Sequence, residues 1–353
     1  MSKYMKLALE LAKNGTPSPN PYCGAVIVKN GKIIGRGFHA RAGEAHAEVN
    51  ALREAGEKAR GAVLYVTLEP CSHYGKTPPC TKAIIEAGIK RVVYGARDVN
   101  PLVQGEEELK KEGVEVKGGV MKKECEELNE IFFKFMESKL PFVLLKSAMS
   151  LDGKIACASG DSKWISGEEA REYSHALRSE YDAILVGINT VLKDNPKLTS
   201  RVEGGRNPLR VILDSKLRIP LDANVLADSN VIIATSEKFD EKKKRVLERK
   251  GVRVLVLGKE RVGMRALMKK LGELGVTSVL IEGGGEVSAS ALKEKIVDKV
   301  LFFIAPKIIG GRSAPSPVGG EGAKSMREAL KLARVSFRKV GEDLAVEAYT
   351  AFI

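Results

Sequence analysis

The residues best able to do chemistry in this sequence lie between positions 46 and 80. His46 is followed by Glu48, then by Pro70-Cys71, and then by Cys80. One imidazole and two thiolates make a three-ligand zinc set, which leaves one coordination position for water. Bound zinc lowers the pKa of that water toward neutrality. The pattern therefore predicts one catalytic zinc per chain, held by His46, Cys71 and Cys80.

Glu48 follows the histidine by two residues, which suits a proton carrier beside the metal. At a helix start both side chains face one cavity, while only His46 reaches the zinc. A carboxylate there can move protons to a ring and to departing ammonia. His-x-Glu followed by Pro-Cys-x-x-Cys is the signature of zinc nucleobase deaminases. Here Cys71 and Cys80 are nine residues apart, so a loop must join them. The alternative is a chance grouping of one histidine and two buried thiols.

Helices and strands alternate around these residues. We expect helices at 5–12, 46–58, 81–87, 106–111 and 122–139, and strands at 25–28, 33–34, 62–68, 91–94 and 114–116. Asn30-Gly31 is a hairpin turn signal. The order helix, hairpin, helix, strand, helix, strand predicts a three-layer α/β domain. Leu140-Pro141 breaks the last helix, so we expect domains at 1–140 and 141–353.

The second half of the sequence has no cluster of His and Cys, but it has a repeated strand–helix pattern and a glycine-rich turn. We expect strands at 142–146, 183–186, 210–213, 231–234, 252–257, 278–281 and 297–304, alternating with helices in a doubly wound α/β domain. Glu282-Gly283-Gly284-Gly285-Glu286 follows one of these strands directly. A glycine-rich turn into a helix lets backbone amides approach phosphate oxygens. A tight turn without a ligand is the alternative.

Composition narrows the class of protein. The net charge of +13 among 353 residues indicates attraction to anions, or simply a Lys/Glu-rich surface of the kind found in heat-stable proteins. Aromatic residues make up 5%, which leaves few stacking platforms for single-stranded nucleic acid. Five cysteines at irregular spacing do not make a disulfide framework. No signal peptide or membrane-spanning run is recognisable, so we expect a cytoplasmic protein.

Segments 46–49 and 67–80 (TLEPCSHYGKTPPC) resemble the deaminase half of bacterial bifunctional riboflavin biosynthesis enzymes, a branch of the cytidine deaminase-like fold. The similarity runs from about Tyr4 to Val120. It implies that Asn20 and His39 hold the base. It also implies that a second group reaches the ribose phosphate: His73, Lys76, Asp98 and Asn100. An exposed loop lysine is the alternative for Lys76, and an ordinary turn for 98–101.

Segments 146–154, 162–166, 186–196 and 281–285 resemble the reductase half of the same enzymes, which has a dihydrofolate reductase-like fold. This similarity covers about 141–352. It assigns the following residues to NADPH: Ala148, Trp164, Thr190, Asp194, Ser215, Gly284, Gly285, Glu286, Val287, Ser288, Ala289 and Ser290. It assigns a second set to the substrate: Ser162, Arg178, Leu198, Arg201 and Glu282.

The side-chain chemistry of several residues in this half also suits a ligand site. The guanidinium forks of Arg178 and Arg201 suit a ribose phosphate, although surface charges are the alternative. Trp164 suits a pocket wall or, alternatively, a core position. Lys146 and Glu282 lie at strand ends, where α/β sites form, so we expect them to orient the ribose chain.

The resemblance implies two reactions. Zinc-activated water replaces the 2-amino group of 2,5-diamino-6-ribosylamino-4(3H)-pyrimidinone 5′-phosphate, and NADPH then reduces the ribosyl group to a ribityl chain. We expect a small-molecule substrate, no nucleic-acid or membrane partner, and a homo-oligomer, either dimer or tetramer. One alternative is a tRNA or DNA base deaminase. The basic net charge favours it, but the small number of aromatic residues argues against it. The other alternative is a non-enzymatic regulator or scaffold that retains the fold, and the complete zinc set argues against it.

Overall fold

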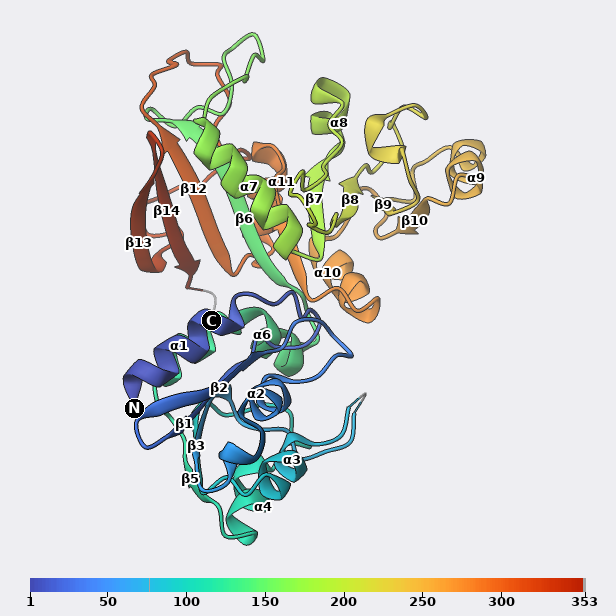
Figure 1. The fold of residues 1–353 in the computed structure, drawn as a ribbon. Coiled ribbons are helices and arrows are strands. Elements are labelled where there is room, and N and C mark those ends of the chain that lie inside the picture. Colours follow the sequence, from blue (N-terminus) through green and yellow to red (C-terminus); the bar gives the residue numbers. More distant parts are fainter. Residues whose placement is uncertain (76, 352–353) are drawn as a thin grey trace. The chain divides into compact units, whose positions relative to one another are not determined.

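The computed structural model describes residues 1–75 and 77–351, and the chain divides into two compact units, Met1–Lys139 and Leu140–Ile353 (Figure 1). Each unit is built on its own sheet. All five cysteines lie within the described residues and are free. Across 1–75 and 77–351, no helix combines the length and the apolar composition needed to cross a membrane.

The first unit has a five-stranded sheet in the order β2-β1-β3-β4-β5. Its strands are β1 (Gly24–Lys29), β2 (Lys32–Phe38), β3 (Val63–Leu68), β4 (Arg91–Ala96) and β5 (Glu115–Lys117). The turn between β1 and β2 is Asn30-Gly31, and both residues have positive φ, as a tight hairpin requires. Because β3 and β4 run parallel, their carboxyl ends meet at one edge of the sheet.

Helices cover both faces of this sheet: α1 (Ser2–Ala12), α2 (Ala47–Ala55), α3 (Cys80–Glu86), α4 (Gly105–Lys111), α5 (Lys122–Leu128) and α6 (Glu130–Ser138). A Cβ atom on Gly24 would collide with α1, and one on Gly37 would collide with the Ala47 carbonyl of α2. Gly37 pairs with Ala25, the neighbour of Gly24. Successive residues of a strand face opposite sides, so α1 and α2 lie on opposite faces and the three-layer prediction is confirmed.

The expected single helix over 122–139 is wrong. The structure ends α5 at Leu128 and begins α6 at Glu130. Between them, the buried amide of Asn129 accepts a hydrogen bond from the Tyr22 nitrogen at 2.7 Å and donates one to the Tyr22 carbonyl at 2.9 Å. This pair of hydrogen bonds to a distant backbone segment stabilises a non-helical conformation at Asn129.

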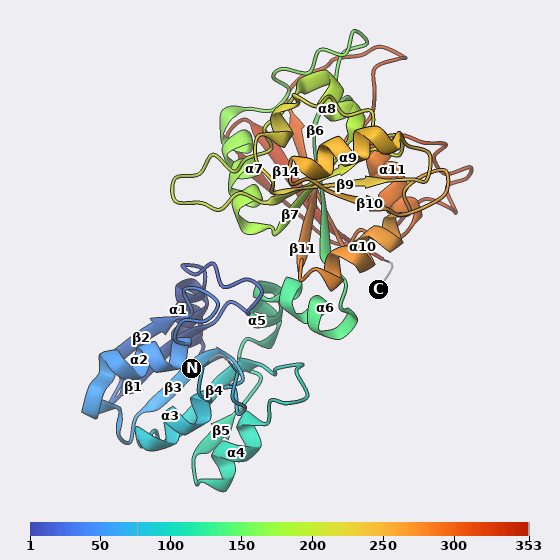
Figure 2. The same ribbon diagram turned by 90° about the vertical axis from the view of Figure 1, so that its right-hand side faces the viewer.

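The second unit has a nine-stranded sheet in the order β10-β9-β8-β7-β11-β6-β12-β14-β13. Its strands are β6 (Phe142–Ser150), β7 (Ala183–Gly187), β8 (Leu209–Leu213), β9 (Val231–Thr235), β10 (Arg253–Val256), β11 (Ser278–Ile281), β12 (Lys299–Ala305), β13 (Leu332–Val340) and β14 (Asp343–Thr350). The helices are α7 (Glu168–Glu180), α8 (Ile188–Asp194), α9 (Glu241–Arg249), α10 (Met264–Glu273) and α11 (Gly285–Lys293). Figure 2 shows α10 and α11 together on one side of this sheet.

The central parallel strands β7, β9 and β11 are buried on both faces, which is why they read as largely continuous apolar runs, whereas the edge strand β10 is not buried. In β7, Ala183 and Leu185 pack into one core with α10, while Ile184 and Val186 pack into a second core with α8 and α9. The helices therefore lie on both faces of the parallel part, as the doubly wound prediction requires.

The C-terminal hairpin of β13 and β14 was missed in the sequence. β14 is antiparallel to β12, and β13 is antiparallel to β14 at the edge of the sheet. Every residue of β13 up to Lys339 is exposed, so the strand has no buried face to generate an alternating pattern. The parallel sheet thus acquires an antiparallel edge, which the sequence prediction did not include.

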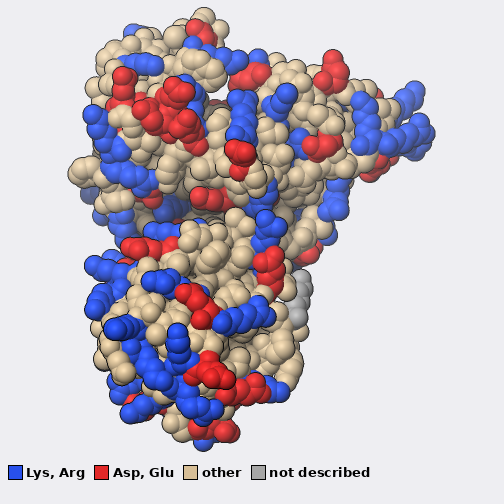
Figure 3. All heavy atoms as spheres, in the orientation of Figure 1, with Lys and Arg blue, Asp and Glu red and all other residues tan. Residues whose placement is uncertain are grey.

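Figure 3 shows Lys and Arg interspersed with Asp and Glu on the face drawn, with basic side chains gathered over α9. That helix contains Lys242, Lys243, Lys244 and Arg245. Lys242 and Arg245 are exposed, so these basic side chains belong to a solvated helix surface.

Candidate active sites

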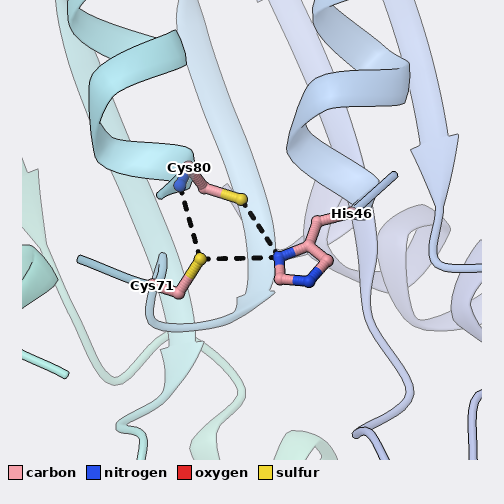
Figure 4. Close-up of side chains that lie close together, drawn as sticks. All are labelled: His46, Cys71 and Cys80. Carbon is pink, nitrogen blue, oxygen red and sulfur yellow. Dashed lines mark hydrogen bonds between the residues drawn. The ribbon is translucent and has the colours of Figure 1, made fainter. Parts of the chain in front are cut away.

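His46, Cys71 and Cys80 converge in the first unit (Figure 4), with one ligand atom of each within 4.8 Å of the others. The Nδ1 atom of His46 lies 3.3 Å from Sγ of Cys80 and 3.5 Å from Sγ of Cys71. In tetrahedral zinc with ordinary bond lengths, nitrogen and sulfur ligands lie about 3.6 Å apart. The three side chains therefore fit a zinc ion.

The local fold explains this convergence. His46 is the residue before α2, Cys71 follows the carboxyl end of β3, and Cys80 is the first residue of α3. The loop between the cysteines turns back, so the Cys80 nitrogen donates to Sγ of Cys71 at 3.3 Å. Hydrogen bonds from Cys80 and His46 lower the pKa of the Cys71 thiol despite its burial, which favours the thiolate that a metal needs.

Thr77 is a part of this site that sequence reasoning missed. Its Oγ1 lies 3.3 Å from Nε2 of His46. Since Nδ1 faces the two sulfur atoms, this contact engages the other ring nitrogen and orients the imidazole, as outer partners of metal-ligating histidines do. Nothing in the type or spacing of Thr77 distinguishes it from any other loop threonine.

Glu48 lies in the first turn of α2 and is 3% exposed. Its Oε2 atom is buried and, among the described residues, has no hydrogen-bond partner. Burial, followed by the nearby Cys71 thiolate, raises the pKa of this carboxyl to about 7. A carboxyl group that titrates near neutrality can both take up and release a proton, as general acid–base catalysis requires.

A cavity of about 240 Å³ opens over this cluster and is lined by most of the residues predicted for the base and phosphate. Of the predicted residues, the following line it: Asn20, His39, His46, Glu48, Cys71, His73, Asp98 and Asn100. Lys76 lies outside the described residues. Phe132 and Glu69 also line the cavity and were not predicted.

Two histidines of this cavity differ in their partners. His39 donates from Nδ1 to the Ala45 carbonyl at 3.1 Å, so its Nε2 accepts from Nδ2 of Asn20 at 3.0 Å. Burial lowers the pKa of His39, which is consistent with this neutral ring. His73, in contrast, has a buried Nδ1 with no partner among the described residues. A ligand in the cavity can therefore satisfy both Glu48 and His73.

Glu69 holds the segment that carries Asp98 and Asn100. Its buried carboxylate accepts from the Glu106 nitrogen at 3.0 Å and from the Asp98 nitrogen at 3.4 Å. Asp98 in turn accepts from the Asn100 nitrogen at 2.8 Å, and burial raises the pKa of Asp98 to about 6. The Asp98 side chain thus closes a local turn onto Asn100, and Glu69 anchors this segment beside the cavity.

A second cavity, of about 370 Å³, lies in the second unit beside the glycine-rich turn. Of the residues predicted for NADPH, its lining includes Thr190, Asp194, Gly284, Gly285, Glu286 and Val287. Ser162, predicted for the substrate, lines the same cavity. The turn joins β11 to the first residues of α11, the geometry that offers backbone amides to phosphate.

The other residues predicted for NADPH do not line this cavity in the described structure. Ser288 and Ser290 donate their hydroxyl groups to the backbone carbonyls of Gly284 and Glu286, one turn earlier. Trp164 is 63% exposed, so the core alternative is wrong, and the Arg171 guanidinium lies 4.8 Å from its ring centre. Ala289 lies on α11 between these two serines, whereas Ala148 lies in β6 and Ser215 follows β8.

Three of the six residues predicted for the reductase substrate form a charged group: Lys146, Arg178 and Glu282. Arg201 is exposed, in keeping with the surface charge that was its alternative. Arg178 on α7 donates from Nε and Nη2 to the two oxygens of Glu282, at 3.0 and 2.7 Å. Its Nη1 donates to the Thr199 carbonyl at 3.2 Å. Burial opposes ionisation of Glu282, but Arg178 and Lys146 hold its pKa at about 2. Arg178 is therefore not the free surface charge that was the alternative.

Leu198 and Arg201 belong to the segment that follows α8, and both have positive φ, as does Asn195. Positive φ is costly for residues with side chains, and such residues cluster at functional sites. This backbone carries Thr199, whose carbonyl accepts from Arg178. The segment is thereby linked to the charged group around Glu282.

Two family models match the chain. The model of the cytidine and deoxycytidylate deaminase zinc-binding region matches residues 1–96, and the model of the RibD C-terminal domain matches residues 141–346. The first match contains the zinc set. The second contains the glycine-rich turn and the charged group around Glu282.

Full-length relatives and solved structures agree with both matches. The riboflavin biosynthesis protein RibD of Aquifex aeolicus is 48% identical over 348 residues, covering 97% of this chain and 96% of that protein. RibD of Escherichia coli is 39% identical, covering 97% of each chain. The structure of Acinetobacter baumannii RibD, form 1, is 38% identical, with a TM-score of 0.90 over 99% of this chain and 98% of that chain.

These matches span both units, and the first unit presents the donor set that zinc requires. The chain therefore belongs to the RibD family of bifunctional riboflavin biosynthesis enzymes, with a zinc-binding deaminase unit followed by an NADPH-dependent reductase unit.

Proposed function

We propose that the chain performs two successive reactions on one pyrimidine nucleotide. The first removes the 2-amino group of 2,5-diamino-6-ribosylamino-4(3H)-pyrimidinone 5′-phosphate as ammonia. The second reduces the ribosyl group, giving 5-amino-6-ribitylaminouracil 5′-phosphate. A Thermotoga maritima relative, 41% identical over 99% of this chain, is named a diaminohydroxyphosphoribosylaminopyrimidine deaminase/5-amino-6-(5-phosphoribosylamino)uracil reductase. That name supports this substrate and this order.

The observation that carries the deaminase proposal is one cavity that holds a zinc set and two buried polar atoms, on Glu48 and His73, which have no hydrogen-bond partner among the described residues. When bound, zinc would act as a Lewis acid and lower the pKa of a coordinated water. Glu48 takes a proton from the attacking water and delivers it to the departing amino group. His46, Cys71 and Cys80 hold the metal.

The remaining residues of the cavity orient the substrate. Asn20 and His39, joined by a hydrogen bond, hold the base. His73, in the loop after Cys71, holds the ribose phosphate together with Asp98 and Asn100, which follow β4. Lys76 is assigned to the same phosphate from the sequence resemblance. The direct test is ammonia release from this nucleotide, with single-stranded RNA as a control that should release none.

The glycine-rich turn is proposed to hold the phosphates of NADPH. Thr190 and Asp194 from α8 lie in the same cavity, and the sequence resemblance adds the rest: Ala148, Trp164, Ser215, Gly284, Gly285, Glu286, Val287, Ser288, Ala289 and Ser290. NADPH, when bound, supplies the hydride for the reduction. The turn presents backbone donors at the beginning of α11, which suits an anion.

Substitutions at two neighbouring glycines distinguish an effect on cofactor binding from an effect on folding. A Cβ on Gly284 would meet nothing within 4 Å, whereas one on Gly285 would lie 2.6 Å from the Ser316 carbonyl oxygen. We expect Gly284→Ala to keep the wild-type melting temperature but to weaken NADPH binding about tenfold or more, by displacing a phosphate hydrogen bond. Gly285→Ala should lower the melting temperature. Unchanged NADPH affinity in Gly284→Ala, measured by titration, would remove the turn from the cofactor site.

The substrate end of the reductase site is proposed to be the charged group around Glu282. Arg178 and Arg201 supply guanidinium groups for the ribose phosphate, and Leu198 belongs to the same strained segment as Arg201. Lys146 and Glu282 orient the ribose chain. Ser162 is assigned to the substrate and lines the cavity that contains the cofactor turn, so it belongs where the two ligands meet.

We also propose a cytoplasmic homodimer, the simplest of the expected oligomers. β13 is an exposed edge strand of nine residues, and Val335 and Phe337 on it are 60% and 75% exposed. Such an edge is a template for pairing, and two-fold symmetry lets it meet a second copy of itself. Sedimentation should give twice the chain mass of 38.3 kDa, and Phe337→Glu should give monomers. A monomeric wild-type protein would refute this arrangement.

A further inference from the structure

His175 lies on α7 and is the one histidine in the sequence after residue 140. Its Nδ1 atom is buried and has no hydrogen-bond partner among residues 1–75 and 77–351. A buried polar atom without a partner costs free energy, and such an atom in a native protein calls for an explanation. A bound ligand that supplies the missing partner is one such explanation.

The charges around His175 indicate the kind of ligand. Arg178 lies three residues further along the same helix, on the same face. The positive charges of Arg178, Arg201 and Lys146 and the negative charge of Glu282 all act on the imidazole. The bidentate ion pair of Arg178 with Glu282 neutralises one charge of each sign. Lys146 and Arg201 then leave this region net positive, which favours an anionic group.

We propose that Nδ1 of His175 donates a hydrogen bond to the 5′-phosphate of the reductase substrate, which makes His175 a further substrate-binding residue. The inference rests on the proposed function of the second unit. Burial, and then the charges of Arg178 and Arg201, lower the pKa of His175, so its ring is neutral before the ligand binds. A neutral ring carries one N–H donor, and a phosphate oxygen is a strong charged acceptor for it.

A matched pair of variants tests the hydrogen bond. Asn and Leu have nearly the same shape, but only Asn can donate from the position of Nδ1. We expect His175→Leu to raise the KM for 5-amino-6-(5-phosphoribosylamino)uracil about tenfold or more with little change in kcat. His175→Asn should stay within about threefold of the wild-type KM, since it keeps a donor. Ammonia release by the first unit should be the same in all three proteins.

A wild-type KM in His175→Leu would overturn the proposal. Equal losses in both variants would also overturn it, because the shape of the side chain rather than its donor would then matter. A chain in which even the wild type consumes no NADPH with this substrate instead contradicts the proposed function. The two failures are therefore distinguishable.

The ring signals of the histidines give a readout that does not depend on turnover. The sequence has four histidines, and the signal missing from His175→Asn assigns His175. Adding 5-amino-6-(5-phosphoribosylamino)uracil without NADPH should shift this signal and raise the pKa of the ring, because a nearby dianion favours imidazolium. NADP⁺ alone should leave the signal in place. A shift with NADP⁺ only, or no shift with the uracil compound, would overturn the assignment.

Discussion

Replacing Glu48 by Gln should leave zinc bound and reduce ammonia release at least ~100-fold, the lower range of general acid–base contributions. The amide keeps the size of the carboxyl but cannot accept and return a proton. The structure gives the reason for so large an effect. Glu48 is buried in the cavity over the zinc set, and its Oε2 has no partner among the described residues.

Glu57→Gln is the matched control, because Glu57 is an exposed carboxylate that follows the same helix. It should release ammonia at the wild-type rate. Both variants should still reduce the deaminated nucleotide with NADPH, since that site belongs to the second unit. Near-normal ammonia release by zinc-loaded Glu48→Gln would remove this residue from the mechanism.

Replacing Cys71 by Ser should reduce the zinc content from about one per chain to near zero and abolish ammonia release. Zinc prefers thiolate sulfur, and a set of two ligands does not make a catalytic site. The pKa of Cys71 is already lowered by its neighbours, so the substitution removes the thiol best prepared to bind the metal. Elemental analysis after gel filtration measures the zinc.

Cys157→Ser is the control for this experiment, because Cys157 is an exposed free thiol in the second unit. It should retain zinc and both activities. Cys71→Ser should retain NADPH-dependent reduction of the deaminated nucleotide. Full zinc occupancy in Cys71→Ser would contradict the ligand set drawn in Figure 4.

The zinc set could be predicted from the sequence because its residues are chemically distinctive and lie close together along the chain. His46 and Glu48 are two residues apart, and Cys71 stands close behind an apolar strand. Few other roles fit that combination. The central parallel strands could also be predicted, since burial on both faces makes them largely apolar runs. In β7, for example, every residue from Ala183 to Val186 is apolar and buried, which leaves little choice of structure.

Other features had no local signal. Thr77 and Glu69 act through contacts with His46 and the Asp98 segment, and those contacts exist only after the chain has folded. Asn129 interrupts a strongly helical pattern because it bonds to Tyr22, 107 residues away in sequence. β13 lacks a buried face. His175 looks like any polar residue of an amphipathic helix until the fold brings charged groups from other segments near it.

The most direct test of the two-step account follows ammonia and NADPH together, starting from the diaminopyrimidine nucleotide and the wild-type chain. One NADPH should be oxidised for each ammonia released, and NADPH oxidation should lag behind ammonia release. Glu48→Gln should show neither signal until the deaminated nucleotide is added, after which NADPH oxidation should begin at the wild-type rate. Oxidation of NADPH without prior release of ammonia would contradict the order of the two reactions and the separate roles of the two units.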